Sequence, residues 1–223
     1  MRSALLVHGA GGGGWEWNLW RGVLAQDLRV DAPDLQPVPA GLQATAFDDY
    51  LSQVRDALHA LPRPRALIGA SLGGLLCAVA AEAADALVLV NPMPPAPFHD
   101  RLPQRSWTQL VPWHRDARLA ATRRAMPDAD DAAALYAFRR WRDESGAVLD
   151  TAQAGVVATR PDCPVLCIVS ELDEDVPATA TRALAEAWQA DLIRRPSASH
   201  VAPLLGRGGV QLARRVAAWL SAW

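Results

Sequence analysis

Residues 65–76 read RALIGASLGGLL and contain the pattern that decides the fold. The apolar run Ala66–Gly69 predicts a buried strand, and the apolar residues after the serine predict a helix. Gly69, Ser71 and Gly73 form the pattern G-x-S-x-G, which is typical of a tight strand-to-helix turn that presents a nucleophilic serine. The glycines relieve Cβ crowding at such a turn, and the N–H groups of the new helix point toward the serine hydroxyl. Ser71 is therefore a candidate nucleophile, and the alternative is that it only caps the helix.

A serine hydroxyl is a weak nucleophile until a base takes its proton, and the base needs a carboxylate that orients it. After such a turn, the expected chain order is serine, acid, histidine. Among five histidines, His200 lies in a late loop, RRPSASHVAP, after the last predicted strand. The acids in VLCIVSELDEDVP, residues 165–177, follow the preceding strand, and we choose Asp173, with Asp175 as the second choice. The predicted catalytic residues are thus Ser71, Asp173 and His200.

The glycine-rich stretch ALLVHGAGGGGWEW, residues 4–17, has two possible functions. It contains G-x-G-x-x-G with Asp34 about twenty residues further on, which is the written form of a dinucleotide-binding loop. That interpretation leaves the candidate triad unexplained. Acyl transfer needs two backbone N–H donors for an oxyanion. We therefore predict that Leu72 and Ala10 supply them, with Gly11 as the alternative to Ala10, and that His8 orders the loop through hydrogen bonds.

Short apolar runs alternate with amphipathic patterns along most of the chain. Strands are expected at 4–8, 28–32, 66–69, 86–91, 165–170 and 191–194, and helices at 15–26, 46–61, 72–84, 178–190 and 209–219. Nearly continuous apolar strands that alternate with helices indicate a mostly parallel central sheet with helices on both faces.

Residues 93–160 interrupt this alternation, because they contain helical patterns but no convincing strand. We predict an α/β core at 1–92 and 161–223, with 93–160 inserted as a small helical cap over the edge of the sheet that binds ligands. Within it, Asp128 is expected to cap a helix that has Asp131 in its first turn. A final set of residues is predicted to bind substrate, consisting of Gly11 and the aromatic residues Trp107, Trp113, Phe138 and Trp141.

Composition excludes several classes of function. The net charge is −2, which gives no overall basic field for nucleic acid, and no segment reaches the length of a membrane span. All 22 basic residues are arginine, which excludes any mechanism that needs a lysine amine. Three cysteines are too few for a disulfide framework, and no metal or organic cofactor is expected. The absence of a signal peptide predicts a cytoplasmic protein.

Several of these motifs, taken in order, resemble the α/β-hydrolase superfamily over nearly the whole chain. They are LLVHGAGGGGW, VDAPDL, IGASLGG, VSELDEDVP and SASHVAP. The sequence is most similar to the small carboxylesterase branch that includes plant methyl esterases and hydroxynitrile lyases. The resemblance implies an N-terminally shortened α/β-hydrolase fold, since the first two strands of the family have no counterpart. Ser170 stands where the acid loop usually has glycine. Hydroxynitrile lyases of this branch use a lysine, which this chain lacks.

The leading functional hypothesis is a serine carboxylesterase that cleaves a small-molecule ester through an acyl-enzyme. One alternative is a thioesterase for thioesters of coenzyme A or an acyl-carrier protein, because five cap arginines could form a docking patch: Arg123, Arg124, Arg139, Arg140 and Arg142. The other is a non-catalytic ligand-binding protein on a hydrolase scaffold.

Overall fold

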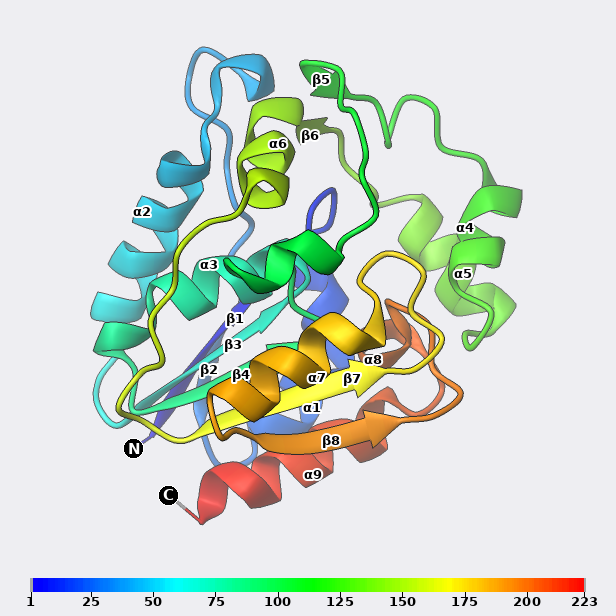
Figure 1. The fold of residues 1–223 in the computed structure, drawn as a ribbon. Helices are drawn as coiled ribbons and strands as arrows, with labels where there is room; N and C mark the ends of the chain where they lie inside the picture. Colours follow the sequence, from blue (N-terminus) through cyan, green and yellow to red (C-terminus); the bar gives the residue numbers. More distant parts are fainter. Residues whose placement is uncertain (1, 223) are drawn as a thin grey trace.

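The computed structural model describes residues 2–222, and it places six strands in one parallel sheet (Figure 1). In spatial order they are β2 (Arg29–Asp31), β1 (Ser3–Val7), β3 (Arg65–Ala70), β4 (Ala86–Val90), β7 (Val165–Ser170) and β8 (Asp191–Arg195). Every neighbouring pair is parallel, so the carboxyl ends of the strands meet at one edge of the sheet. Ligands bind at this edge in open α/β sheets.

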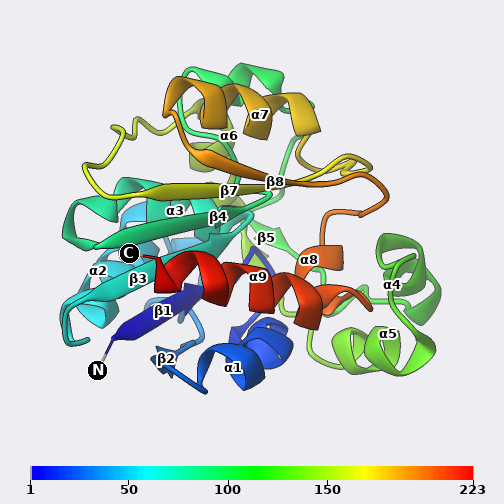
Figure 2. The ribbon, with the colours of Figure 1, turned by 90° about the horizontal axis from the view of Figure 1, so that it is seen from below.

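Helices cover both faces of the sheet, as the sequence predicts (Figures 1 and 2). One face packs against α2 (Phe47–His59), α3 (Leu72–Val79) and α7 (Ala178–Ala187). The other face packs against α1 (Asn18–Leu24), the short α8 (Ala202–Leu205) and α9 (Gly209–Ser221). No helix in residues 2–222 is long and apolar enough to cross a membrane.

Alternation along the strands divides the core into two layers. Leu5 and Val7 of β1 pack on the α2–α3 side, whereas Ala4 and Leu6 pack on the α1–α9 side. Successive side chains of a strand point to opposite faces, so a strand buried on both sides must be apolar at every position. This is why the central strands read as continuous apolar runs.

Most predicted elements are confirmed to within a few residues, but two predicted helices are divided. The helix expected at 15–26 begins as a 3-10 turn, η1 (Gly14–Trp17), before α1 starts at Asn18. The helix expected at 72–84 ends at Val79 and continues as the 3-10 turn η3 (Ala81–Ala83). A further short turn, η2 (Leu42–Ala44), precedes α2.

Residues 93–160, here called the β4–β7 insertion, are not wholly helical. They contain η4 (Phe98–Arg101), β5 (Leu110–Val111), α4 (Leu119–Ala125), α5 (Asp131–Phe138), β6 (Glu144–Ser145) and α6 (Gly146–Ala154). The prediction of no strand is wrong, because β5 and β6 pair as an antiparallel ribbon. Strands of two residues are too short to give a periodic signal. Figures 1 and 2 both show α4 and α5 beyond the arrowheads of the parallel strands.

The expected cap of α5 is shifted by two residues. Asp130, not Asp128, is the N-cap, and its Oδ1 accepts from the Ala133 N–H at 2.8 Å. Asp131 lies in the first turn as predicted. Asp128 instead accepts from the Ser199 N–H at 2.8 Å and thereby fastens the insertion to the loop of His200.

The turn between β3 and α3 depends on two glycines that touch backbone. A Cβ on Gly73 would lie 2.3 Å from the carbonyl oxygen of His8, and one on Gly69 would lie 2.3 Å from that of Gly73. Real Cβ atoms do not approach this closely, and backbone cannot rotate away as a flexible side chain can. This turn, residues 69–73, is here called the elbow, and it packs directly against the end of β1.

We expect Gly73→Ala to lower the free energy of unfolding by about 2 kcal/mol or more, because overpacking a rigid site costs roughly 1–3 kcal/mol. Urea unfolding followed by circular dichroism measures this change. The control is Gly22→Ala on α1, where no atom lies within 4 Å of the added Cβ. This control should raise the free energy of unfolding by about 0.5–1 kcal/mol through helix propensity. Equal effects of the two substitutions would contradict the argument.

Candidate active site

A cavity of about 730 Å³ opens at the carboxyl edge of the sheet. Its lining is mainly apolar and combines residues from the β1 loop, the elbow, the β4–β7 insertion and the loop after β8. Ser71 and His200 both line it, together with Gly9, Ala10 and Gly11. Residues that are far apart in the sequence therefore meet in one concave, apolar site of the kind that binds small molecules.

Ser71 has the strained backbone that its motif predicts. Its φ is 52° and its ψ is −121°, in a region that residues with a Cβ rarely occupy. The turn is held by the Ser71 N–H, which donates to the Val90 carbonyl at 3.0 Å, and by the Ser71 carbonyl, which accepts from the Met93 N–H at 2.9 Å. The Ser71 side chain makes no capping hydrogen bond to α3, so its hydroxyl is not used as the helix cap. Strain maintained in this way is characteristic of functional sites.

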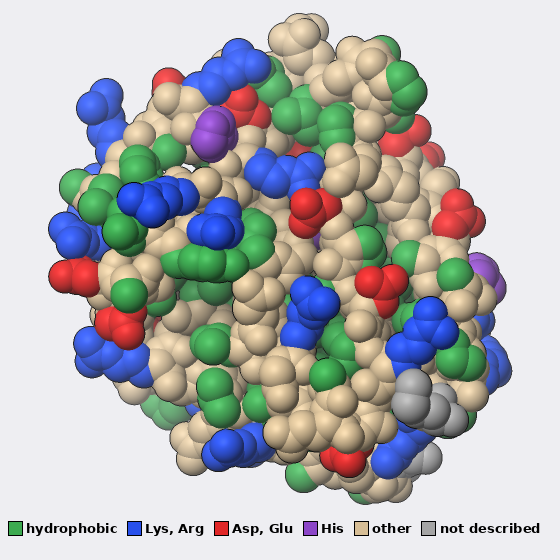
Figure 3. All heavy atoms as spheres, turned by 180° about the vertical axis from the view of Figure 1, so that it is seen from behind, with side chains coloured by type: hydrophobic (Ala, Val, Ile, Leu, Met, Phe, Trp, Pro, Cys, Tyr) green, Lys and Arg blue, Asp and Glu red, His purple; other side chains and the backbone are tan. Residues whose placement is uncertain are grey.

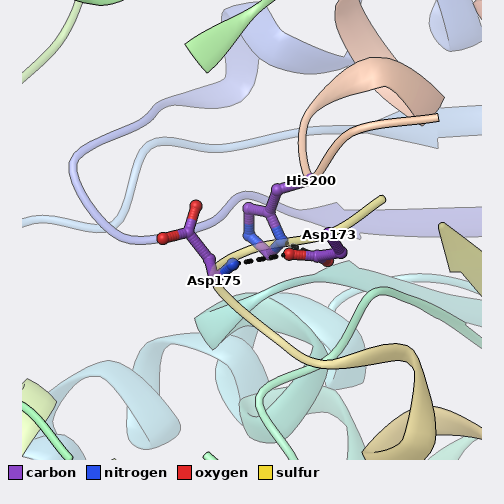
Figure 4. A group of neighbouring side chains, drawn as sticks. All are labelled: Asp173, Asp175 and His200. Carbon is purple, nitrogen blue, oxygen red and sulfur yellow. Dashed lines mark hydrogen bonds and ion pairs between the residues drawn. The ribbon is translucent and has the colours of Figure 1, made fainter. Parts of the chain in front are cut away.

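Asp173 and His200 form a hydrogen-bonded pair (Figure 4). The Nδ1 of His200 lies 2.6 Å from Oδ2 of Asp173. The other oxygen of this carboxyl, Oδ1, accepts from the N–H groups of Asp175 and Val176 at 2.9 and 2.8 Å. These bonds fix the carboxyl and leave Nε2 of His200 free of the aspartate.

The other acids of this loop are engaged elsewhere. The side chain of Asp173 is 1% exposed, whereas that of Asp175 is 53% exposed and pairs with Arg105 at 2.9 Å. Glu171 pairs with Arg182 and Arg194, and hydrogen bonds from these arginines hold its pKa below the usual range. Geometry therefore favours Asp173 over Asp175 as the partner of the histidine.

The pKa of His200 is raised above its usual 6.5. Burial acts to lower it, and the charge and hydrogen bond of Asp173 act in the opposite direction. Asp175 adds to the upward shift, so the imidazolium is favoured overall. A histidine of this kind accepts a proton readily.

Asn91 connects the ends of three strands behind His200. Its Nδ2 donates to the His200 carbonyl at 2.7 Å and to Ser170 Oγ at 2.9 Å. Its Oδ1 accepts from the Ser170 N–H at 2.8 Å. The amide is buried, and its hydrogen bonds hold the His200 loop against the ends of β4 and β7. Ser170, which departs from the usual glycine, is part of this network.

The glycine loop after β1 is fixed by His8. The Leu35 N–H donates to His8 Nε2 at 2.9 Å, so the neutral ring carries its proton on Nδ1 and donates to the Gly9 carbonyl at 2.7 Å. Burial lowers the pKa of His8 to about 4, which keeps the ring neutral. His8 thus orders the loop, as the sequence predicts. Asp34 also binds this loop, since it accepts from the Gly14 N–H at 2.7 Å, and this contact accounts for its spacing from the glycines.

The three predicted oxyanion donors differ in whether their N–H group already has a hydrogen-bond partner. The Gly11 N–H is already bound to Glu144 Oε2 at 2.9 Å. Among residues 2–222, the Ala10 N–H has no hydrogen-bond partner, and the N–H of Leu72 begins α3, where no intrahelical acceptor exists. Among the described residues, the N–H groups of Ala10 and Leu72 are therefore unpaired, whereas that of Gly11 is occupied.

Glu144 connects the insertion to the glycine loop and the core. Besides Gly11, it accepts from the Tyr50 hydroxyl at 2.9 Å and from the Ser145 N–H at 2.8 Å. The Arg142 N–H donates to the Gly11 carbonyl at 2.7 Å, so both polar groups of Gly11 are held by the insertion. The left-handed φ of Gly11, +65°, accompanies this arrangement.

The predicted pocket residues are only partly brought together. Gly11, Trp107, Trp113 and Trp141 line the cavity, and Phe138 is not among the lining residues. The rings of Trp107 and Trp113 meet edge to face with centroids 5.8 Å apart. Phe138 ends α5, and the aromatic character on which its prediction rests does not indicate the direction of a side chain.

Three of the five arginines proposed to form a docking patch have separate partners. Arg142 turns inward and donates to the Leu35 carbonyl at 2.6 Å. Arg123 pairs with Asp131, and the Arg140 guanidinium lies 3.6 Å from the centre of the Tyr136 ring. On the face drawn in Figure 3, basic side chains are scattered among acidic and hydrophobic ones.

Asp173, Asp175 and His200 have ligand atoms within 4.8 Å of one another, a spacing that a metal ion could bridge (Figure 4). Their existing bonds account for this proximity. Both oxygens of Asp173 accept hydrogen bonds, and Asp175 is paired with Arg105. The cluster therefore fits a histidine–carboxylate pair without an ion.

Sequence reasoning missed three polar residues of the site, which are Glu16, Asn91 and Glu144. All three are buried. The sequence offered only weak signals for them. Glu16 is an acid between two tryptophans directly after the glycine loop, and Asn91 is an amide at the end of a predicted strand. Neither pattern identifies a hydrogen-bond partner that lies far away in the sequence.

The family model described as "Alpha/beta hydrolase family" matches residues 4–215. The chain therefore belongs to the α/β hydrolase family, and the superfamily predicted from the motifs is confirmed. A search of curated proteins finds no match.

Solved structures share this fold over their whole length. A pyrethroid hydrolase from Sphingobium faniae JZ-2 is 20% identical with a TM-score of 0.73, covering 100% of this chain and 98% of the other. The methylesterase MES16 from Arabidopsis is 14% identical with a TM-score of 0.75, covering 100% of both chains. Tomato methylketone synthase I is 16% identical with a TM-score of 0.76, covering 100% and 99%. At these identities the likeness establishes the fold.

Replacing Glu144 by alanine should lower the free energy of unfolding by about 2–4 kcal/mol, because three donors lose a buried acceptor. Tyr50→Phe alone should cost less, and the double variant should show a coupling of about 1 kcal/mol or more with Glu144→Ala. Urea unfolding of wild type, the two single variants and the double variant gives the double-mutant cycle that measures this coupling. Asp150→Ala, on the exposed side of α6, serves as the control and should change stability by less than about 0.5 kcal/mol. Additive effects of the first two substitutions would show that the hydroxyl and carboxyl do not depend on each other.

Proposed function

We propose that the protein is a serine hydrolase that cleaves a small carboxylic ester through an acyl-enzyme intermediate. The observation that carries this proposal is the arrangement around one cavity. A serine at a strained strand-to-helix turn and a histidine bound to a buried aspartate both line it. Nucleophile, base and orienting carboxylate are the three parts that activate a hydroxyl group.

In the proposed acylation step, Nε2 of His200 takes the proton from Ser71 Oγ as the oxygen attacks the ester carbonyl carbon. The C=O π electrons move to the carbonyl oxygen, and the free N–H groups of Ala10 and Leu72 bind the oxyanion. The tetrahedral intermediate collapses, the bond to the alkoxy oxygen breaks, and His200 returns the proton to the departing alcohol. Asp173 stabilises the imidazolium and keeps the ring oriented.

Deacylation repeats these steps with water. His200 removes a proton from water, the hydroxide attacks the acyl carbon, and the same N–H groups bind the second oxyanion. Collapse of this intermediate breaks the bond to Ser71 Oγ, which recovers its proton from His200. The sum of the two half-reactions is ester plus water giving acid plus alcohol, with no oxidant, metal or cofactor in the balance.

The lining of the cavity supports an ester with an apolar part as substrate. Trp107, Trp113 and Trp141 of the β4–β7 insertion contribute large apolar surfaces beside the candidate nucleophile. We take this insertion to be the cap that selects the substrate. The names of two structural neighbours, a pyrethroid hydrolase and a methylesterase, agree with ester hydrolysis, although their low identity limits them to supporting evidence.

A fluorophosphonate probe should add once to the wild-type protein and not at all to Ser71→Ala. The reason is that only a serine with an activated hydroxyl attacks the phosphorus centre. Intact-mass spectrometry followed by peptide mapping measures the adduct and its position. The control is Ser52→Ala, which removes a hydroxyl on α2 that is bonded to the Asp48 carbonyl and should label like wild type. An adduct that persists in Ser71→Ala would overturn the assignment, and binding of esters without turnover or labelling would favour the ligand-binding alternative.

Ester hydrolysis should also depend on the protonation of His200. The neutral ring is the active base and the pKa of His200 is raised, so kcat/KM should rise with pH and level off above an apparent pKa greater than 6.5. Asp173→Asn removes the main partner that raises this pKa, so the apparent pKa should fall, and kcat should fall by about 10²–10⁴-fold. The pH profile of a chromogenic ester measures both.

The matched control for this profile is Asp175→Asn. Asp175 is exposed and paired with Arg105, so its neutralisation should change kcat by no more than about threefold. A larger loss of activity in Asp175→Asn than in Asp173→Asn would exchange the roles of the two acids.

A further inference from the structure

Glu16 is a buried acid inside the candidate active site that the proposed mechanism does not use. It lies in η1, directly after the glycine loop, and is 5% exposed. It is one of the residues that line the cavity with Ser71 and His200. Its carboxyl fills the space that a side chain on Gly12 would occupy, since a Cβ there would lie 2.1 Å from Glu16 Oε2.

The hydrogen bonds that hold this carboxyl come from backbone donors. Oε2 accepts from the Gly9 N–H at 3.2 Å, and the Gly13 N–H also acts on the carboxyl. Within residues 2–222, no arginine forms an ion pair with Glu16. Glu16 has no hydrogen bond to another side chain among residues 2–222, so the O–H of its protonated form can be directed to a molecule in the cavity that it lines.

Burial raises the pKa of Glu16 to about 8, and the N–H groups of Gly9 and Gly13 and the charge of His200 only partly oppose it. The other charged groups near the loop are already engaged. Asp34 binds the Gly14 N–H and faces Arg142, and Glu144 binds the Gly11 N–H. Burial therefore favours the protonated form of the Glu16 carboxyl.

Glu16 is bound to a residue that lies beside the candidate nucleophile. A Cβ on Gly9 would lie 3.2 Å from the Cβ of Ser71 and 3.8 Å from its Oγ, so Gly9 lies beside the candidate nucleophile. The N–H of this same Gly9 binds Glu16. In the acyl-enzyme the acyl carbon is bonded to Ser71 Oγ, so atoms within a few bonds of that carbon occupy this part of the cavity.

We propose that Glu16 is a specificity-determining residue that donates a hydrogen bond to an acceptor atom of the acyl group, close to the scissile carbonyl. The preferred substrates are then esters whose acyl part carries an ether, keto or hydroxyl oxygen within two or three bonds of the carbonyl carbon. This inference rests on the proposed ester hydrolysis and adds the substrate class. It assigns the O–H of Glu16 an acceptor, which a buried donor requires.

The test compares 4-nitrophenyl methoxyacetate with 4-nitrophenyl butanoate, which have the same shape and differ by one ether oxygen. Because the two esters differ in intrinsic reactivity, the measured quantity is the ratio of their kcat/KM values in each variant, relative to wild type. Glu16→Met keeps the volume and removes the donor, so the ratio should fall about tenfold, the size of one neutral hydrogen bond. Glu16→Gln keeps an N–H donor and an acceptor for Gly9, so its ratio should stay within about twofold of wild type.

The pH dependence separates a donor from a shape effect. In wild type the ratio should fall above pH 8, where Glu16 ionises and can no longer donate, because its pKa is raised to about 8. In Glu16→Gln the ratio should stay constant across the same range, since an amide does not titrate. Difference infrared spectroscopy provides a reading independent of turnover. A protonated carboxyl C=O band should be present at neutral pH, disappear as pH rises through 8, and be absent from Glu16→Gln.

The outcomes are distinguishable from failure of the proposed function. If wild type turns over neither ester and Ser71 is not labelled, ester hydrolysis itself is wrong. If both esters are hydrolysed and Glu16→Met lowers their kcat/KM values equally, the ratio for this pair is unchanged. The result that overturns the proposal is an unchanged ratio in Glu16→Met for both pairs, this one and 4-nitrophenyl 3-methoxypropanoate with pentanoate, whose oxygen lies one bond further away. In that case Glu16 only supports the glycine loop.

Discussion

The site depends on direct backbone contact between the elbow and the end of β1. Gly73 packs against the carbonyl oxygens of Val7 and His8, which brings the start of α3 close to the glycine loop. The same closeness forces Ser71 into its positive φ. A side chain on Gly73 would push the start of α3 away from the end of β1. Two glycines therefore set the distance between a strand end and a helix start, and the remaining residues of the site are placed relative to that distance.

A second constraint comes from the β4–β7 insertion. It holds both polar groups of Gly11 through Glu144 and the Arg142 backbone, and it holds the loop of His200 through Asp128. Two sides of the candidate site are thus fastened to the same segment that supplies the tryptophans of the cavity. The insertion that lines the cavity also binds the glycine loop, so the shape of the cavity and the geometry of this loop are not independent in this fold.

Sequence predicted the parts of this structure that arise from local rules. The parallel strands could be found because burial on both faces makes them continuously apolar, and the elbow could be found because only glycine tolerates its contacts. The strands β5 and β6 could not, since two residues carry no period, and Asp130 was missed as the cap because several aspartates in succession look equally suitable. The prediction that Phe138 lines the pocket failed for a similar reason, because an aromatic residue in a sequence does not reveal which way its side chain points. Asn91 and Glu144 act through partners 79 or more residues away, which no local pattern records.

Three buried carboxyls near the cavity, those of Asp173, Glu144 and Glu16, have different hydrogen-bond partners, and these partners distinguish them chemically. Asp173 faces an imidazole that can become a cation, so its negative charge has a partner whenever His200 takes a proton. Glu144 receives a hydroxyl and two backbone N–H groups from three segments, which makes it a fixed connection between them. Glu16 receives only backbone N–H groups, and burial favours its neutral form. A neutral acid is a donor as well as an acceptor, and among these three carboxyls Glu16 is the one whose surroundings leave the donor to whatever enters the cavity.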